Sequence, residues 1–174
     1  MSKSVIKTKK TLNELYISLG SNIENRLDFI EKSIDLIDSQ VGSVIKKALV
    51  YETPAWGFIS TPFLNTCICI TTKYSTKEAL FLFQNIEKEL GRKTKTTTTY
   101  EARPIDIDII YTSEGIFNTP TLIVPHPLMQ KRLFVLIPLL DIAKHYQHPL
   151  LHKNTIALIE DCKDDAIISV LKNS

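Results

Sequence analysis

The chain has 174 residues, of which 44% are hydrophobic and 23% are charged, and its formal net charge is +2. This length suits one well-formed core, so we expect a single domain over residues 1–174, with residues 1–12 as a flexible basic segment. A net charge this small does not by itself indicate that the protein binds nucleic acid. No apolar run approaches the ~20 residues that a membrane span needs. The first ten residues lack the apolar core of a signal peptide, which predicts a cytoplasmic protein.

The N-terminal part of the chain predicts a strand followed by a helix. Residues 15–19, LYISL, have the composition of a short buried strand, and Gly20 to Asn22 supply turn residues that would end it. From Asn25 to Val41, apolar residues recur at spacings of three and four, with charged residues mostly between them. This period predicts an amphipathic helix that ends at Gly42.

The middle of the chain predicts two strands and a second helix. One strand is expected over residues 43–51 and another over 63–73, separated by a loop that contains two prolines, a glycine and Trp56. Ser75 and Glu78 then match a capping box at the start of a helix that ends at Gly91. We expect Cys67, Cys69 and Cys162 to be reduced thiols, because they show no metal-ligand spacing.

The segment RKTKTTTTYEAR, residues 92–103, holds four basic residues and one acidic residue. Such a composition is typical of a solvated loop, although its β-branched threonines would also suit a strand. Beyond the strand that follows it, an extended piece is expected over 119–125, a helix over 131–140 and a short helix near 155–162. The order β-α-β-β-α-β predicts an α+β, ferredoxin-like antiparallel sheet with helices on one face and a C-terminal extension. The other face would then be available for a ligand.

The stretch RPIDIDIIYTSEG, residues 103–115, places two carboxylates in an apolar strand. Residues two apart share a strand face, so Asp106 and Asp108 should point one way, with Cα atoms roughly 7 Å apart. The opposite face is expected to carry Ile105, Ile107, Ile109 and Tyr111. An edge strand that merely meets solvent would produce the same pattern.

Paired carboxylates are ligands that Mg²⁺ prefers, and Mg²⁺ usually completes its shell with water and substrate phosphates. The basic segment just upstream, with Arg92, Lys93, Lys95 and Arg103, offers countercharges for a polyphosphate. Together these features favour phosphoryl transfer. The chain has no GxxxxGK[ST] phosphate loop, and Gly20 stands too far from Asp106 for a nucleotidyltransferase signature.

Several motifs together resemble those of the 6-hydroxymethyl-7,8-dihydropterin pyrophosphokinase family of folate biosynthesis. They occur in order as YISLGSN (16–22), YETP (51–54), FLN (63–65), IEKELGR (86–92), ARPIDIDII (102–110), VPHPLMQKRLFVLIPLLDIA (124–143) and HP (148–149). The resemblance implies a ferredoxin-like fold and transfer of pyrophosphate from ATP to the hydroxymethyl group of the pterin, with release of AMP.

The resemblance also implies roles for individual residues. Asp106 and Asp108 would hold two Mg²⁺ ions, and Arg92 and Arg103 would close over the phosphates. Phe63 and Phe134 would stack on the pterin ring. The residues implied to contact the pterin are Thr53, Pro54, Trp56, Phe63, Asn65 and Phe134. The nucleotide site would be bordered by Gln84, Glu87, Tyr100, Arg103, Ile109, His126 and Arg132. The implied partners are ATP and the pterin, with no nucleic acid and no membrane, and the chain is expected to be a monomer.

The chain departs from the family pattern at two positions. Thr94, beside Lys95, and Thr121 stand where relatives carry arginines, which removes two phosphate or nucleotide contacts. His145, His148 and His152 are expected to be surface residues, because Pro149 interrupts any helix that would align them as metal ligands. The alternatives that remain are another Mg²⁺-dependent nucleotidyl or phosphoryl transferase and a pterin- or nucleotide-binding module without turnover.

Overall fold

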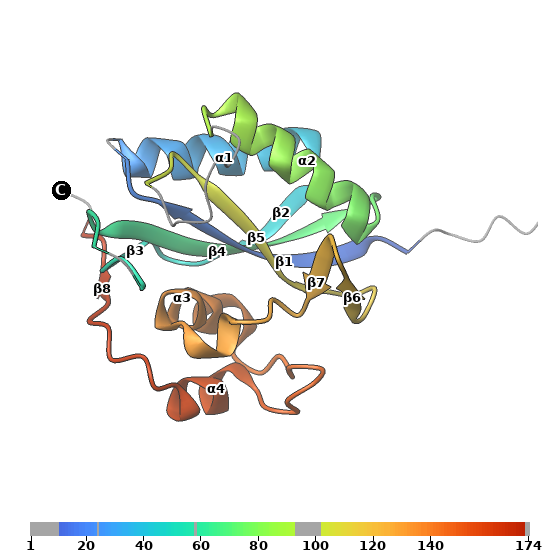
Figure 1. Cartoon of the computed structure of the whole chain (residues 1–174). Coiled ribbons are helices and arrows are strands. Elements are labelled where there is room, and N and C mark those ends of the chain that lie inside the picture. The colour runs from blue at the N-terminus through green and yellow to red at the C-terminus, as the bar shows by residue number, and fades with distance from the viewer. Residues whose placement is uncertain (1–10, 24, 58, 93–101, 173–174) are drawn as a thin grey trace, which may run out of the picture.

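The computed structural model of the chain describes residues 11–23, 25–57, 59–92 and 102–172. Its centre is an antiparallel sheet with the strand order β5-β1-β4-β3-β8, and β2 also pairs with β4 (Figure 1). The strands are β1 (Asn13–Ser21), β2 (Ser43–Lys47), β3 (Tyr51–Thr53), β4 (Phe63–Thr72), β5 (Asp106–Thr112) and β8 (Ser169–Val170). The expected antiparallel α+β architecture is therefore confirmed.

Two helices, α1 (Arg26–Gln40) and α2 (Thr76–Glu89), lie side by side on one face of the sheet (Figure 1). The predicted capping box starts α2, because the Ser75 side chain accepts the backbone N–H of Glu78 while Oε2 of Glu78 accepts the backbone N–H of Ser75. Apolar residues of both helices pack on alternate residues of β1 and β5, including Leu15, Ile17 and Ile107. This core fixes the orientation of β5, so its other face carries the aspartates.

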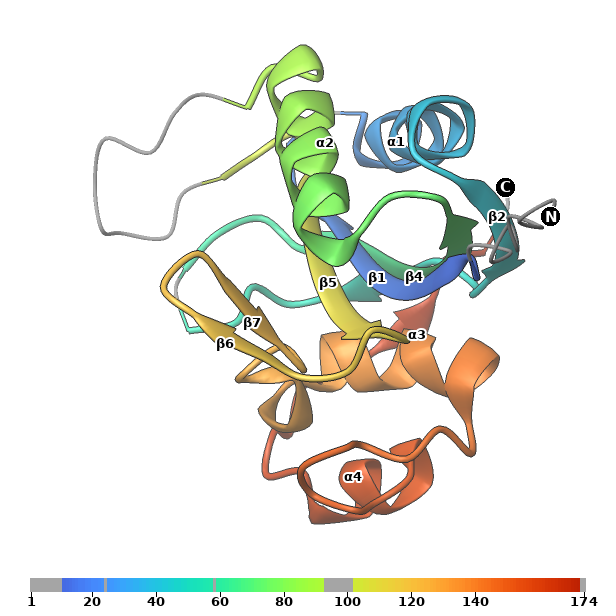
Figure 2. The ribbon, with the colours of Figure 1, turned by 90° about the vertical axis from the view of Figure 1, so that its right-hand side faces the viewer.

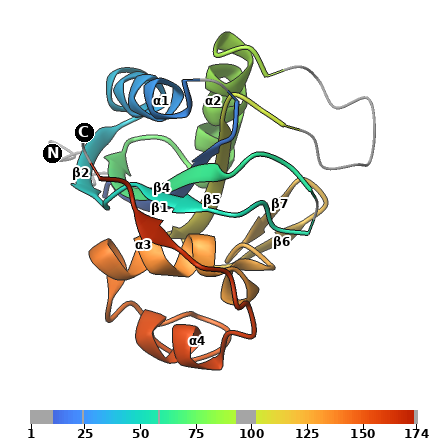
Figure 3. The same cartoon turned by 90° about the vertical axis from the view of Figure 1, so that its left-hand side faces the viewer.

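The C-terminal extension covers part of the opposite face, which is therefore less open than expected. A 3₁₀ turn, η1 (Met129–Lys131), leads into α3 (Leu133–Ala143), and α4 (Thr155–Asp161) packs against α3 (Figures 1 and 2). Strands β6 (Phe117–Thr119) and β7 (Leu122–Val124) form a separate hairpin. After α4 the chain runs up to the sheet and adds β8 beside β3 (Figure 3).

Two predicted strands differ from those in the structure. Gly20 and Ser21 do not form a turn, because β1 continues through both of them and pairs Gly20 with Asn65. The strand predicted over 43–51 is divided into β2 and β3, which pair with successive parts of β4. The division lies where the backbone N–H of Leu49 turns to Oδ2 of Asp141 on α3, at 3.1 Å.

Tyr111 lies on the face opposite to the one predicted. The pairing of β1 with β5 shifts by one residue between Tyr16 and Ile17, which is a β-bulge in β5. The extra residue turns Tyr111 away from Ile105, Ile107 and Ile109 and into the core under α3. There its ring stacks on Tyr146, with centroids 4.4 Å apart.

His148 is not the surface residue that was predicted. Its side chain is only 4% exposed, its ring meets the edge of Tyr111, and its Nδ1 accepts the backbone N–H groups of Leu150 and Leu151. Cys67 and Cys69 are buried free thiols, and Cys162 is half-buried. Among the described helices, none is long and apolar enough to cross a membrane.

Candidate active site

A pocket opens on the sheet face opposite α1 and α2, at the end of β1 where α3 begins. Its floor is built across three neighbouring strands by cross-strand pairing. Gly20 of β1 stands between Asp106 of β5 and Asn65 of β4, and Ser18 pairs with Asp108 one step further along. The small residues in the central strand leave room above the sheet, and the pocket holds about 580 Å³ of empty space, part of it open to solvent.

Gly20 is required by this close packing. A Cβ atom at this position would lie 2.7 Å from Oδ1 of Asn65, which is closer than side-chain atoms approach without displacement. Asn65 has little freedom to move, because it is 3% exposed and its Nδ2 donates to Oγ1 of Thr53 at 2.8 Å. The Asn65 amide can therefore occupy this position only because residue 20 has no side chain.

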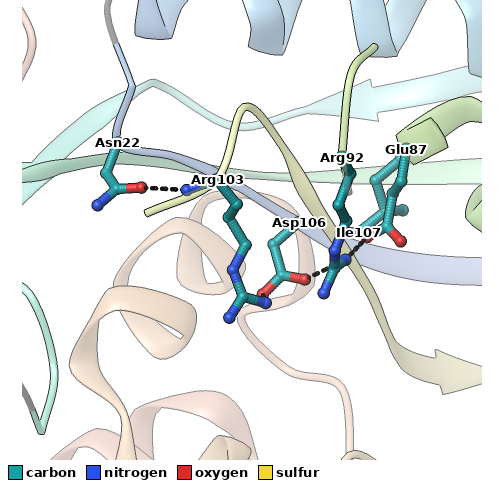
Figure 4. A network of polar contacts seen from close by, with 6 residues as sticks. All are labelled: Asn22, Glu87, Arg92, Arg103, Asp106 and Ile107. Carbon is teal, nitrogen blue, oxygen red and sulfur yellow. Dashed lines mark hydrogen bonds and ion pairs between the residues drawn. The ribbon is translucent and has the colours of Figure 1, made fainter. Parts of the chain in front are cut away.

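Two arginines hold Asp106 from opposite sides (Figure 4). Nη1 of Arg92 donates to Oδ1 of Asp106 at 2.7 Å, and Nη1 of Arg103 donates to Oδ2 at 3.1 Å. Arg92 also forms a short ion pair with Glu87 of α2. One carboxylate of the pair is thus neutralised by the two basic residues that flank the segment 93–101.

Glu87 anchors this network to the sheet. Its Oε1 accepts the backbone N–H of Ile107 at 2.8 Å, and its side chain is almost fully buried. Burial raises the pKa of Glu87, and the nearby Arg92 offsets part of that rise by favouring the carboxylate. Glu87 therefore fixes Arg92 between α2 and β5 rather than leaving it in solvent.

Asp108 differs from Asp106 in its electrostatic surroundings. Burial, followed by the negative charges of Asp106 and Glu87, raises the pKa of Asp108 to about 7. Two carboxylates on one strand face repel unless a cation lies between them. A bound divalent cation would favour the ionised form of both, so the pair is suited to a metal that substrate phosphates help to hold.

The side of the pocket away from the aspartates is aromatic. The rings of Trp56 and Phe134 meet edge to face with centroids 6.5 Å apart. The guanidinium carbon of Arg132 lies 4.7 Å from the Trp56 centroid and 5.6 Å from that of Phe134, and Arg132 is only 7% exposed. Phe63 completes this wall from β4. A flat, polar heterocycle fits such a wall, because ring faces accept stacking while Asn65 can recognise an edge.

Asn22 ties the two sides of the pocket together. Its Oδ1 accepts the backbone N–H of Arg103 at 2.8 Å (Figure 4). Its Nδ2 donates to Oγ of Ser60 at 2.9 Å. The hydroxyl of Thr61 donates to the Asn22 carbonyl at 2.8 Å. The β3–β4 loop and the start of β5 are thus held by one buried amide.

The structure gathers most of the residues singled out from the sequence. Those that line the pocket are Thr53, Pro54, Trp56, Phe63, Asn65, Arg103, Asp106, Asp108, Arg132 and Phe134. Glu87 and Arg92 join it through their ion pairs. Ser18, Gly20 and Asn22 were not singled out, and the signal for Ser18 and Gly20 was the alternation of small residues at the end of a buried strand.

Besides Glu87, which reaches the pocket only through its ion pair with Arg92, four predicted nucleotide-site residues lie outside the pocket lining or outside the described residues. Gln84 is exposed on α2, and the side chain of Ile109 packs in the core beneath the helices. His126 is half-buried, and burial followed by the charge of Arg132 lowers its pKa to about 4, so it is neutral at pH 7. Tyr100 falls within residues 93–101, outside the described part of the chain, as does Thr94.

A family model matches this chain over residues 16–144, and its description is 7,8-dihydro-6-hydroxymethylpterin-pyrophosphokinase. A 2-amino-4-hydroxy-6-hydroxymethyldihydropteridine pyrophosphokinase of Porphyromonas gingivalis is 38% identical over 138 residues, which cover 78% of this chain and 93% of that protein. The Aquifex aeolicus protein of the same description is 36% identical and covers 80% and 86% respectively.

Some relatives are much longer than this chain. The folic acid synthesis protein fol1 of Pneumocystis carinii is 35% identical over 98% of this chain, but the match spans only 23% of that protein. A crystal structure of Plasmodium falciparum HPPK-DHPS superposes with a TM-score of 0.73 at 14% identity, covering 88% of this chain and 46% of the other. That likeness shows a shared fold.

Proposed function

The chain belongs to the 7,8-dihydro-6-hydroxymethylpterin-pyrophosphokinase family of folate biosynthesis and is a pyrophosphokinase, and we propose that the pocket beside Asp106 and Asp108 is where it transfers pyrophosphate. The donor would be ATP, the acceptor the hydroxymethyl group of 6-hydroxymethyl-7,8-dihydropterin, and the nucleotide product AMP. The observation that carries this proposal is one pocket that joins paired carboxylates and arginines to an aromatic wall. Phosphates suit the charged side, and a pterin suits the aromatic side.

The metal ligands in this proposal are Asp106 and Asp108. The described residues contain no cluster of three or more His, Cys, Asp or Glu side chains that would form a complete protein cage. Two carboxylates fit Mg²⁺ nevertheless, because this ion is commonly held by one or two carboxylates together with water and substrate phosphates. Bound there, two Mg²⁺ ions would neutralise the triphosphate and orient its β-phosphorus.

The arginines would change partners when the pocket fills. Arg92 and Arg103 both contact Asp106 in the structure, where they compensate its negative charge. A cation at Asp106 would weaken both contacts, and the guanidinium groups would turn to phosphate oxygens, which they bind through two parallel hydrogen bonds. Glu87 would keep Arg92 close to the site during this exchange.

The acceptor would be held by stacking and by a fixed amide. Phe63 and Phe134 offer ring faces to the pterin, and Asn65 can both donate to and accept from its edge. Because Asn65 is held by Thr53 and confined by Gly20, its amide is oriented before the ligand arrives. Fixing the hydroxymethyl group near the β-phosphorus lowers the entropic part of the barrier.

Incubation with ATP, Mg²⁺ and the pterin tests the reaction. AMP should form only when the pterin is present. Formation of ADP or of free pyrophosphate as the product would indicate another class of transferase. Binding of both ligands without any nucleotide product would indicate a binding module.

The physiological setting is also part of this proposal. We expect a cytoplasmic monomer that needs neither nucleic acid nor a membrane, and a net charge of +2 agrees with small-molecule substrates rather than polyanionic partners. Light scattering at working concentrations tests the monomer, because a particle of about twice the 19.8 kDa chain mass would contradict it.

A further inference from the structure

A second, larger cleft lies on the far side of Trp56 from the catalytic pocket. It is bounded by η1, the segment before α4, α4 itself and the start of the C-terminal arm, and it holds about 1140 Å³ of empty space, much of it open to solvent. Figures 1 and 3 show α4 on the side of α3 away from the sheet, and the arm running from α4 past α3 up to β8. The proposed reaction uses no residue of this cleft except Trp56, which lines both.

The charged residues of the cleft leave an excess of positive charge. Its lining carries Lys131, Lys153 and Lys163 against Asp161 and Asp164. Lys153 is paired with Asp161, whereas Lys131 and Lys163 form no ion pair with any residue that the structure describes.

Asp164 is already engaged by the backbone. Its Oδ2 accepts the N–H of Leu133 at 2.9 Å, at the start of α3, and its Oδ1 accepts the N–H of Ala166 at 3.1 Å. These hydrogen bonds fix the carboxylate in place, and Asp164 forms no ion pair with any residue that the structure describes. The cleft therefore has two ammonium groups available to an anion.

The floor and one wall of the cleft are apolar, and one buried polar atom faces no partner. Leu158 is 2% exposed, and Leu151 and the Trp56 indole extend the apolar surface. Oε1 of Gln130 is buried without a hydrogen-bond partner among the described residues, although its Nε2 donates to the carbonyl of Pro127 at 3.2 Å. A buried acceptor without a donor costs free energy that a ligand can recover.

We propose that this cleft is a second binding site for a small aromatic anion that carries a hydrogen-bond donor. The anionic group would pair with Lys131 and Lys163, and the ring would lie over Leu151, Leu158 and the indole of Trp56. The donor would meet Oε1 of Gln130 once a rotation of that half-buried side chain turns the buried atom toward the cleft. Because Trp56 also contacts Arg132 and Phe134, an occupant would touch a wall of the catalytic pocket.

Three probes separate these contributions in titrations of the full chain by calorimetry. 4-Hydroxybenzoate carries the anion, the ring and the donor, benzoate lacks the donor, and phenol lacks the charge. We expect saturable binding of 4-hydroxybenzoate, with benzoate at least about threefold weaker and phenol at least about tenfold weaker. Trp56 is the only tryptophan, so a single indole N–H resonance should shift along the same binding curve.

Variants assign the binding to the cleft. Lys131→Gln together with Lys163→Gln should weaken 4-hydroxybenzoate at least about tenfold, because two charge-assisted contacts are lost. Lys77→Gln with Lys144→Gln removes the same charge from exposed positions outside the cleft and should leave the affinity unchanged.

Three results would overturn the proposal. They are no saturable binding of 4-hydroxybenzoate, equal affinities for 4-hydroxybenzoate and benzoate, or an undiminished affinity in the Lys131→Gln, Lys163→Gln double variant. The last result would place the probe in the arginine-lined catalytic pocket instead. The titrations need neither ATP nor turnover, so their outcome is independent of whether the chain transfers pyrophosphate.

Discussion

Nη1 of Arg92 donates to Oδ1 of Asp106 across 2.7 Å, so a residue expected to contact phosphate compensates a residue expected to hold metal. This pairing gives the site an internal countercharge. It also means that metal and phosphate should bind together. A metal at Asp106 would release Arg92, and a phosphate at Arg92 would release Asp106. The predictions below follow from this arrangement and from the packing around it.

Changing Asp106 and Asp108 to Ala should lower kcat at least about 10³-fold, because charge stabilisation at the reacting phosphates is lost. The fold should persist, because the change removes two like charges from one strand face. Steady-state rates and circular dichroism measure the two effects. Asp35→Ala with Asp165→Ala removes the same charge from exposed positions and should leave kcat unchanged. Turnover retained by the first pair would contradict the metal assignment.

Gly20→Ala should impair pterin binding. The added Cβ would stand 2.7 Å from Oδ1 of Asn65 and displace an amide that is held by Thr53. We expect the KM for the pterin to rise about tenfold, with a loss of roughly 1–3 kcal/mol in the free energy of unfolding. Gly115→Ala is the control, because it strains a backbone with φ of 100° far from the pocket. An unchanged KM for the pterin in Gly20→Ala would show that Asn65 does not contribute to pterin binding.

Phe63→Ala should raise the KM for the pterin at least about tenfold, because a stacking face is removed from the pocket. The exposed Phe81 on α2 offers a matched control, since it is 61% exposed and Phe81→Ala should change neither KM nor kcat. Fluorescence titration with the pterin provides a direct affinity for comparison. If the two variants bind the pterin equally well, Phe63 contributes packing only.

The raised pKa of Asp108 predicts a pH-dependent stability in the absence of metal. Its folded-state pKa is about 7, against roughly 3.9 in an unfolded chain. Between these values the folded state binds the extra proton, so the contribution of Asp108 to the free energy of unfolding falls as pH rises from about 4 to 7. Asp108→Asn should flatten this dependence in urea titrations at pH 5 and pH 8. Parallel behaviour of the two proteins would show that Asp108 is not the group responsible.

Metal binding should depend on pH in the opposite sense. Mg²⁺ needs the ionised carboxylate, so its affinity should increase as pH rises towards and through 7, with proton release on binding below that pH. Calorimetry in buffers of different ionisation enthalpy measures the protons released. Release that is the same at pH 6 and pH 8 would contradict a coordinating role for Asp108.

Sequence patterns predicted the parts of the site that follow from strand alternation. Asp106 and Asp108 share a face as expected, and Phe63 and Asn65 line the same pocket, because alternation within one strand depends only on that strand. Tyr111 was assigned to the wrong face, since the bulge that turns it arises from the pairing of β5 with β1. Pairing between strands distant in sequence cannot be deduced from either strand alone.

The small residues show the same limitation. Gly20 and Ser21 have turn-forming composition, yet β4 pairs with both and extends β1, so tertiary pairing outweighs local preference. The role of Gly20 depends on its neighbour Asn65, which is 45 positions away. His148 was likewise assigned to the surface, because its sequence neighbours do not reveal that the ring of Tyr111, on a different element, packs against it.

The most direct test of the central claim is the fate of the β-phosphate. Wild-type protein would be incubated with Mg²⁺, the hydroxymethyl-dihydropterin and ATP labelled with ³²P at the β position, and the products separated. Transfer of pyrophosphate predicts that all transferred label is found in the pterin product and that the AMP is unlabelled. Label retained in ADP would show that only the γ-phosphoryl group moves, and the account given for this pocket would be wrong.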